Sequence, residues 1–536
     1  MKIEATGTVT VNGSIHASSA ATPNYGTNTG VNDATAGAGG SIYITADSFK
    51  GVNGVLRADG GNSSCPTNYN VGRVGGGGCI AIKYNAASQQ DGYVSGMTIS
   101  AAPGKYKWKV SSKTYELGVR DDDKYRSEAG LGTLWFTDAK MLQSLGTGIT
   151  GNILNISEYS ADSLTISSGH FRFSADGFRL SISGNLAISG ASSRLEIGGS
   201  IFTNRMGHAD FYSATAPQIT IGGNLSVSDG ARLDIRAAAT NETTSVGANV
   251  SVSGAFTIGA DSIVYCWCDS KTGGYPRFEV QTLTIAEGGE LTASGRGFAG
   301  GYTTVAGQNG SYISKGAGPG AGGVYTNPYA SGGGHGGRAG NYDPTKSLQT
   351  ERGGWPYDDQ FMPTMPGSGG ADASTWYTAF GGSGGGVVDV RALGNVSIAG
   401  SVTADGETGR MGYVGSGGGG TIYITGHSFT GAATGILSAK GGAVSIENNV
   451  TYNGAGGGGR ISVWAGDPYD STVKPSRIIR SSEAPTLEKM SFLGTVTAAG
   501  GATTQENTST RTYTPGDGTV WFSYVQPEPG MTLIIQ

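Results

Sequence analysis

The sequence predicts an all-β protein, a right-handed parallel β-helix (β-solenoid) with glycine-rich turns and a long irregular loop insertion. Three observations predict it: short segments alternate apolar and polar residues, glycine runs directly precede many of these segments, and much of the sequence occurs twice. Alternation with a period of two indicates half-buried strands, and the Gly, Asn and Asp between them indicate tight turns. Only residues 136–145 suggest a short helix.

The repeated part opens and closes the chain. Val9 corresponds to Val396 and Ile42 to Ile422, so the copies lie about 380 to 387 residues apart. Repeats that bury their strands on neighbouring repeats are typical of stacked architectures. We therefore divide the chain into the terminal part of a first module, regular solenoid coils, a glycine- and aromatic-rich loop region, and a second copy of the terminal part, at residues 1–145, 146–295, 296–385 and 386–536 respectively.

The regular coils contain pairs of short alternating strands, each pair joined by a turn. The first strands of successive pairs resemble one another, as in NLAIS (185–189) and NLSVS (224–228), whereas the connection that follows each pair varies in length. This fits coils of about three parallel strands with one loop of free length. A β-sandwich built from hairpins is the alternative. The resemblance between first strands and the concentration of insertions at one corner favour the solenoid.

Glycine accounts for 96 of the 536 residues, and its runs have fixed positions. They directly precede alternating strands, as in GGTIYI (419–424) and GGRISV (458–463). Glycine permits close approach of backbones, so the runs fit tightly packed turns or segments resembling polyproline II. The alternative is a flexible linker. Because the runs lie inside the repeat unit at constant offsets from strands, we favour an ordered structure.

Three repeated segments carry a resemblance to a known class of protein. The segments GAGGSIYIT (37–45), VLRADGG (55–61) and GGGGCIAIKY (75–84), with their second copies, resemble the glycine-rich parallel β-helix repeats of large bacterial surface and secreted proteins. They are similar to autotransporter passengers and other adhesins. The resemblance implies an extracellular or cell-surface location and brings no catalytic motif. We expect a structural or adhesive segment, a rigid surface-displayed or fibre-forming solenoid.

The sequence also predicts which partners to expect. Strands at the ends of the solenoid present unpaired edges, which favours self-association or continuation into further modules. The net charge of −5 argues against nucleic acid as a partner, since no basic field exists. No run of 18 apolar residues occurs, so we expect no membrane insertion. The sequence predicts no cofactor and no metal.

The loop region at 296–385 is the candidate ligand surface. Aromatic rings stack on the apolar faces of sugars, and nearby polar side chains bond the hydroxyl groups. A glycan-binding adhesin is therefore the second functional hypothesis, although the same rings could instead pack the insertion against the solenoid. The candidate ligand-binding residues are Trp355, Tyr357, Asp358, Asp359, Trp376, Tyr377, His335 and Arg338.

A polysaccharide lyase or hydrolase is the third hypothesis. Such chemistry needs two or three carboxylates, or carboxylates with basic groups, on adjacent coils. The densest candidates, Asp358 and Asp359 with His335 and Arg338, lie on a glycine-rich loop and not on consecutive strands. We therefore expect no enzyme and assign no catalytic residue.

The four cysteines form two pairs. Cys65 and Cys79 flank glycine-rich turns, and either a disulfide or two free thiols fits their positions. Cys266 and Cys268 alternate along one strand, so both point to the same face. Core packing explains that pair better than a metal, because neither a CxxC spacing nor a nearby histidine accompanies it.

Overall fold

The structure of the chain is a computed structural model that divides into two compact units. Unit 1 comprises Met1–Ser160, Leu164–Arg179 and Ile188–Asp210, and unit 2 comprises Ala161–Ser163, Leu180–Ala187 and Phe211–Gln536. The residues described are 1–21, 36–65, 74–110, 113–117, 130–199, 201–205, 208–212, 214–240, 246–301, 314–323, 330–340, 353–372, 380–409, 414–444, 454–466, 475–484, 486–487, 489–502 and 514–527.

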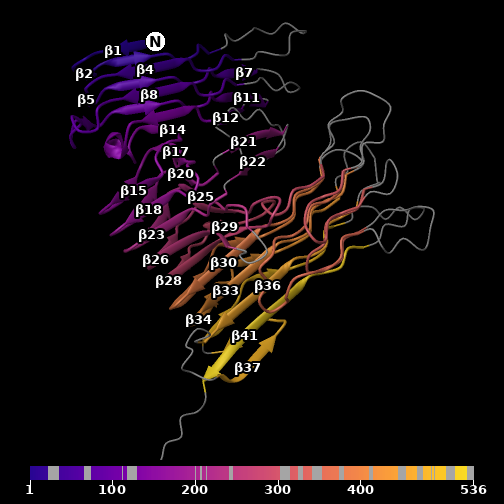
Figure 1. Cartoon of the computed structure of the whole chain (residues 1–536). Helices are drawn as coiled ribbons and strands as arrows, with labels where there is room; N and C mark the ends of the chain where they lie inside the picture. Colours follow the sequence, from indigo (N-terminus) through magenta and orange to yellow (C-terminus); the bar gives the residue numbers. More distant parts are fainter. Residues whose placement is uncertain are drawn as a thin grey trace, which may run out of the picture. The chain divides into compact units, whose positions relative to one another are not determined.

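The strands of unit 1 stack in parallel into three ladders, so the predicted all-β parallel solenoid is confirmed (Figure 1). The first ladder contains β1 (Lys2–Glu4), β4 (Ser41–Thr45), β8 (Cys79–Lys83), β13 (Thr133–Phe136), β14 (Ile149–Ile153), β17 (Gly169–Phe173) and β20 (Ser193–Ile197). The second contains β2 (Thr8–Thr10), β5 (Ser48–Val52) and β9 (Val94–Ser95), and the third contains β3 (Ser14–His16), β6 (Val55–Arg57) and β10 (Thr98–Ser100).

Unit 2 repeats the three-ladder arrangement with longer ladders. The first contains β23 (Gln218–Ile221), β26 (Val246–Ile258), β28 (Tyr275–Ile285), β30 (Val387–Ala392), β33 (Thr421–Gly426), β36 (Arg460–Ala465) and β41 (Thr519–Pro527). The second contains β24 (Leu225–Ser228), then β26 and β28 again, followed by β31 (Asn395–Ile398), β34 (Ser428–Gly431) and β39 (Met490–Phe492). The third contains β25 (Arg232–Arg236), β27 (Ile263–Trp267), β29 (Glu290–Thr292), β32 (Ser401–Thr403), β35 (Ile436–Ser438) and β40 (Thr495–Thr497).

The remaining elements extend these ladders, or decorate and connect them. A 3-10 helix, η1 (Ala139–Ser144), lies within the segment for which a short helix was predicted, and the Asp138 carboxylate accepts from the Lys140 N–H at its start. The other strands are β7 (Ser63–Cys65), β11 (Tyr106–Val110), β12 (Lys113–Leu117), β15 (Glu158–Ala161), β16 (Leu164–Ile166), β18 (Arg179–Ile182), β19 (Leu186–Ser189), β21 (Ile201–Arg205), β22 (His208–Tyr212), β37 (Pro475–Ser481) and β38 (Thr486–Leu487). Of these strands, β15, β16, β18 and β19 extend the ladders.

The core of each coil comes from the apolar positions of the alternating strands. In β33, Ile422 and Ile424 are fully buried, and they pair in register with Ile461 and Val463 of β36. Burial of such a side chain stabilises the fold by roughly 1.5–3 kcal/mol. The same alternation that predicted the strands therefore supplies the stacked interior.

The glycine-rich segments of unit 2 run on beyond the strand ends (Figure 1). Their backbones hydrogen-bond to one another in a lattice. In residues 415–420, backbone N–H groups that are three residues apart donate to the same neighbouring segment. Three residues per turn is the period of a polyproline II helix, which has no internal hydrogen bonds. The N–H groups of Gly415 and Gly418 donate to the carbonyl oxygens of Ala371 and Ser368. The N–H groups of Ser416 and Gly419 donate to the oxygens of Gly454 and Gly457. The N–H groups of Gly417 and Gly420 donate to the oxygens of Glu407 and Ala404. The segment thus bonds to three neighbours through its donors.

The carbonyl groups of the same segment reach three more neighbours. The carbonyl oxygens of Gly415 and Gly418 accept the N–H groups of Gly382 and Gly385. The Ser416 oxygen accepts the Gly333 N–H, and the Gly417 oxygen accepts the Gly442 N–H. Packing this dense leaves no room for a side chain: a Cβ on Gly417 would lie 1.9 Å from the Ser383 oxygen. The sequence prediction that the glycine runs are packed segments and not flexible linkers is thus confirmed for the described part of the chain.

A smaller lattice of the same kind lies in unit 1. Gly75 donates to Gly61, which in turn donates to Gly37. A Cβ on Gly75 would lie 1.8 Å from the Gly37 oxygen, whereas on the next residue, Gly76, it would meet only one atom, at 3.9 Å. The steric demand for glycine therefore differs sharply between adjacent positions.

Equivalent side chains in the two copies of the repeat join the end of the third strand of one coil to the next coil by a hydrogen bond. Ser18 aligns with Asp405, and each accepts one backbone N–H of the following coil: Ser18 Oγ that of Asp59 at 3.0 Å and Asp405 Oδ1 that of Lys440 at 2.6 Å. Asp405 Oδ1 also accepts from Ser438 Oγ at 2.6 Å.

We expect Asp405→Ala to lower the free energy of unfolding by about 2 kcal/mol and Ser18→Ala by about 1 kcal/mol, because hydrogen bonds to charged groups contribute more than neutral ones. Denaturant unfolding of both variants measures this. Equal losses in the two variants would contradict the assignment.

Candidate functional site

Residues 355–366, here called the strap, cover the outer face of the β33–β36–β41 sheet. All residues of β33 and β36 are buried, which requires cover on both faces of the sheet. The Phe361 carbonyl accepts from Ser462 Oγ at 2.6 Å and Trp464 Nε1 at 2.9 Å, and the Met365 carbonyl accepts from Thr421 Oγ1 at 2.7 Å. The Phe361 ring packs against Trp464 and its neighbours. The strap therefore serves as the outer layer of this sheet.

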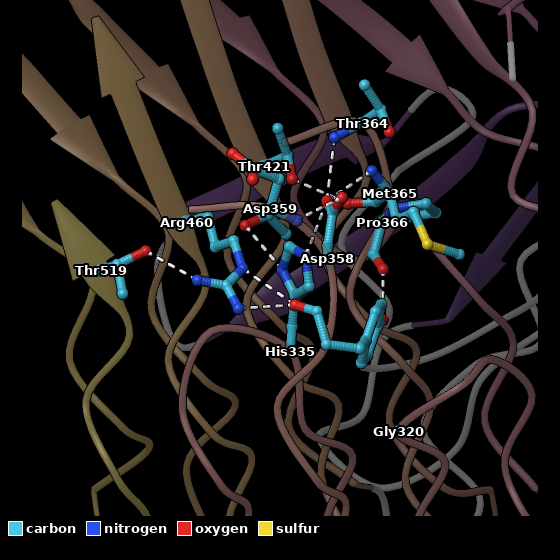
Figure 2. A network of polar contacts seen from close by, with 12 residues as sticks. Gly320, His335, Asp358, Asp359, Thr364, Met365, Pro366, Thr421, Arg460 and Thr519 are labelled. Carbon is cyan, nitrogen blue, oxygen red and sulfur yellow. Dashed lines mark hydrogen bonds and ion pairs between the residues drawn. The ribbon is translucent and has the colours of Figure 1, made fainter. Parts of the chain in front are cut away.

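His335 lies beneath the strap, and its ring is fully buried. Its Nδ1 faces the carbonyl oxygens of Gly419 at 2.9 Å and Gly420 at 3.2 Å, and its Nε2 faces Asp358 Oδ2 at 3.5 Å (Figure 2). Carbonyl and carboxylate oxygens accept hydrogen bonds, so the ring lies between acceptors on both sides. The geometry therefore pairs His335 with Asp358.

Asp358 adopts a left-handed backbone conformation, with φ of 70°, that turns its carboxylate back into the strap. Its Oδ2 accepts the N–H groups of Thr364 at 2.9 Å and Met365 at 2.8 Å (Figure 2). Burial by itself raises the pKa of Asp358, but the hydrogen bond and charge of His335, together with backbone N–H groups, outweigh burial and lower it. The carboxylate is thus held in its charged form.

Arg460 fixes the start of the strap from the first residue of β36. Its Nε and Nη2 donate to the Tyr357 carbonyl at 2.9 and 2.6 Å, and its Nη1 donates to Thr519 Oγ1 at 3.0 Å. Burial lowers the pKa of Arg460, and the nearby charges of Asp358 and Asp359 partly oppose this. The guanidinium joins the strap to two adjacent strands of the sheet.

The Tyr357 hydroxyl lies inside the glycine lattice. It donates to the Pro366 carbonyl and accepts from Ser368 Oγ at 2.9 Å, and Ser368 Oγ in turn accepts the Gly320 N–H at 2.9 Å. Burial raises the pKa of Tyr357, so the hydroxyl stays protonated. The Tyr357 ring also contacts the His335 ring, with centroids 4.8 Å apart.

The remaining predicted ligand residues lie in three situations. Trp355 is 55% exposed, and the Arg338 guanidinium stacks on its ring at 4.1 Å. Asp359 is exposed, and its Oδ1 accepts the N–H groups of Phe361 and Met362 at 2.7 and 2.8 Å. Trp376 and Tyr377 lie outside the described residues. Among the predicted set, His335, Tyr357 and Asp358 therefore come together, and the Trp355–Arg338 pair faces solvent.

This cluster is arranged to fasten the strap. The described polar atoms of His335, Asp358, Tyr357 and Arg460 bond to protein groups, and both His335 ring nitrogens are occupied. A general base needs a nitrogen or oxygen within reach of substrate. What the arrangement offers to a ligand is the exposed Trp355 ring with its guanidinium partner.

Comparison with known proteins gives one match. A family model described as the TamB C-terminal domain matches residues 112–264. TamB is a bacterial outer-membrane assembly protein. The match covers less than half of the chain, and no curated protein and no solved structure is similar to it. The comparisons offer no match to autotransporter passengers or adhesins.

Sequence reasoning missed Arg460, and it did not select Phe361 as a candidate residue although Phe361 belongs to the aromatic-rich loop region. Arg460 aligns with Cys79 of the first copy, and this exchange of a small residue for a buried arginine directly after a glycine run was the available signal. Phe361 carries no pattern of its own. Its partner Trp464 lies in β36, about a hundred residues along the chain.

A second polar cluster, on the third ladder of unit 2, was also missed. Guanidinium groups and aromatic rings alternate there in a stack, with each guanidinium carbon 4.0 to 4.4 Å from the ring centroid it faces, in the order Arg236, Trp267, Arg296, Tyr265 and Arg232. The buried Asp234 binds Arg232 at 2.7 Å and Trp267 Nε1 at 2.8 Å. Burial lowers the pKa of Arg296 to about 10. The stack joins side chains of successive coils.

The cysteines behave mostly as small core residues. Cys266 is buried and free, and burial raises its pKa, which disfavours the thiolate. Cys79 is a free, exposed thiol, so it is not in a disulfide, and the side chain of Cys65 lies outside the described residues. Among the residues that the structure describes, no group of three or more His, Cys, Asp or Glu is arranged to hold a metal ion. Likewise, no described helix is long and apolar enough to cross a membrane.

Proposed function

We propose that this chain is an extracellular structural and adhesive segment of a bacterial envelope protein, a rigid β-solenoid displayed at the cell surface. The observation that carries the proposal is the combination of stacked parallel ladders with a glycine-rich lattice, in which backbone hydrogen bonds provide the cohesion. The match to the TamB C-terminal domain supports the envelope part. The resemblance of the glycine-rich repeats to surface β-helix proteins supports display.

Antibody labelling of the bacterium that encodes the protein tests this location. We expect an antibody raised against the purified chain to label intact cells, and protease added to intact cells to remove the label. Labelling that appears only after permeabilisation of the outer membrane would contradict surface display and favour a location inside the envelope.

A glycan-binding adhesin is the second candidate, and one observation favours it. Trp355 is the most exposed tryptophan side chain among the described residues, and Arg338 holds its ring in place. An exposed ring beside a guanidinium suits a sugar that carries a carboxylate. If this function operates, Trp355→Ala should abolish binding on a glycan array. The matched control is Met362→Ala, since Met362 is 58% exposed on the same strap.

For a purely structural segment we expect no signal on the same array with the wild-type protein. A polysaccharide lyase or hydrolase stays the third candidate, and depolymerisation assays on acidic and neutral glycans test it. Turnover that is lost in Asp358→Asn but kept in Asp359→Asn, in protein that remains folded, would favour the enzyme over both other functions.

A further inference from the structure

The two copies of the repeat end on strands with nearly the same sequence and the same first neighbour. In unit 1, β13 pairs in parallel with β8, with Thr133 opposite Cys79 and Phe136 opposite Ile82. In unit 2, β41 pairs in parallel with β36, with Thr519 opposite Arg460 and Phe522 opposite Val463. The strands are equivalent, so their outer edges can be compared directly.

The outer edges of β13 and β41 differ. In unit 1 the next coil begins there, because β14 joins β13 in parallel with Asn152 opposite Thr133 and Ile153 opposite Leu134. In unit 2 the edge of β41 is occupied from Phe522 onward by β37, which runs antiparallel. The neighbouring ladder ends in the same way, because β38 pairs antiparallel with β39. Antiparallel strands on two of the three ladders occupy edge positions that a following parallel coil would use.

The first coil of the chain has the surface that such an edge would receive. Its central residues Ile3, Val9 and Ile15 are only partly buried. Their equivalents in the second copy are fully buried beneath a preceding parallel coil, with Phe278 opposite Val390, Leu283 opposite Val396 and Leu291 opposite Val402. In the second copy, the coil with this sequence is therefore covered by the edge of another parallel coil.

We propose that β37 and β38 form a cap that prevents the first coil of a second copy of this chain from docking on the β39–β41 edge. Exposed strand edges promote pairing between chains, and proteins commonly block them. The end-to-end self-association expected from the sequence is, on this view, blocked at this edge when β37 and β38 are in place. The inference does not depend on where the protein is located, so its failure leaves the labelling experiment unaffected.

The structure shows where the cap can be removed, with loss of the Arg480 guanidinium that lies 4.3 Å from the Phe361 ring centroid. Gly466 and Lys489 flank the cap in the sequence. The Gly466 N–H donates to the His427 oxygen, and the Lys489 oxygen accepts the Phe429 N–H. Because His427 and Phe429 are only two residues apart, Gly466 and Lys489 lie near each other. Residues 467–488 can therefore be replaced by a short glycine linker that joins Gly466 to Lys489. A milder second variant is Ile479→Pro, because proline opposite Tyr524 removes a donor from β37.

Sedimentation equilibrium over a range of protein concentrations provides the test. We expect wild-type protein to remain monomeric and the uncapped protein to form oligomers that grow with concentration. The matched control adds Ile3→Asp, Val9→Asp and Ile15→Asp to the uncapped protein and should restore the monomer, with an unchanged circular dichroism spectrum. If the deletion does not fold, the same outcomes are expected from Ile479→Pro with and without the three aspartates.

Three outcomes would overturn the proposal: a folded uncapped protein that stays monomeric, oligomers that persist in the aspartate control, or the same oligomers in wild-type protein.

Discussion

Replacement of Gly75 by alanine is expected to destabilise unit 1 by about 3 kcal/mol or more. The new Cβ would lie 1.8 Å from the Gly37 oxygen and 2.9 Å from the Gly61 nitrogen, and both are backbone atoms of the lattice. Backbone atoms that are hydrogen-bonded on several sides cannot move away from the new Cβ without breaking those bonds. The loss of free energy of unfolding should therefore reach or exceed the upper end of the penalties for overpacking. Thermal and denaturant unfolding measure the loss.

The adjacent residue provides the matched control. A Cβ on Gly76 would meet only the Gly130 oxygen at 3.9 Å, which is ordinary contact. We expect Gly76→Ala to leave stability unchanged or to raise it by up to about 1 kcal/mol, because alanine restricts the unfolded chain. Similar losses at the two positions would show that glycine is required here for flexibility and not for packing.

Replacement of Asp358 by asparagine is expected to cost about 3 kcal/mol, because it removes a buried carboxylate that faces His335 Nε2 and accepts two backbone N–H groups. If the amide oxygen keeps accepting from Thr364 and Met365, the amide nitrogen lies against the Asp359 N–H, which donates to the other carboxylate oxygen in the wild-type protein. Asp359→Asn is the matched control, since the side chain is exposed and an amide oxygen can still accept from Phe361 and Met362. Denaturant unfolding at neutral pH compares the two variants.

The same carboxylate predicts a pH dependence. The pKa of Asp358 is lowered from 3.8 in the folded protein, so its contribution is fully present above about pH 4 and is lost as the pH falls through the folded pKa. The stability difference between wild-type protein and Asp358→Asn should therefore shrink as the pH is lowered below about 4. A difference that stays constant down to pH 2 would contradict the ion pair.

The sequence was informative wherever the fold depends on local alternation. Ile422 and Ile424 alternate with Thr421, Tyr423 and Thr425, and this pattern predicts the strand and one of its faces. The prediction that such a strand is half-buried is wrong for β33, because the strap covers its other face. The alignment of Ser18 with Asp405 likewise predicted equivalent positions, and the structure places both at the same kind of link between coils. Such features follow from neighbours a few residues apart or from comparison of the two copies.

The candidate site was harder to predict because its contacts are distant in sequence. His335 bonds to the carbonyl groups of Gly419 and Gly420, which lie 84 and 85 residues away. Those acceptors belong to the backbone, so no residue type marks them. The histidine and aspartate were selected as ligand-binding candidates from composition. Only the three-dimensional arrangement reveals that they pair with each other and that Arg460 completes the cluster.

The glycine lattice has a consequence for the kinetics of folding. Its hydrogen bonds join residues far apart in the chain, as between Gly336 and Gly458, so the contact order of this region is high. Such contacts form only after much chain entropy has been lost, which makes folding slow. Bonds that form after the transition state chiefly retard unfolding. We therefore expect the folded protein to persist through a high barrier to unfolding, so that its lifetime is set by the rate of unfolding more than by the equilibrium stability.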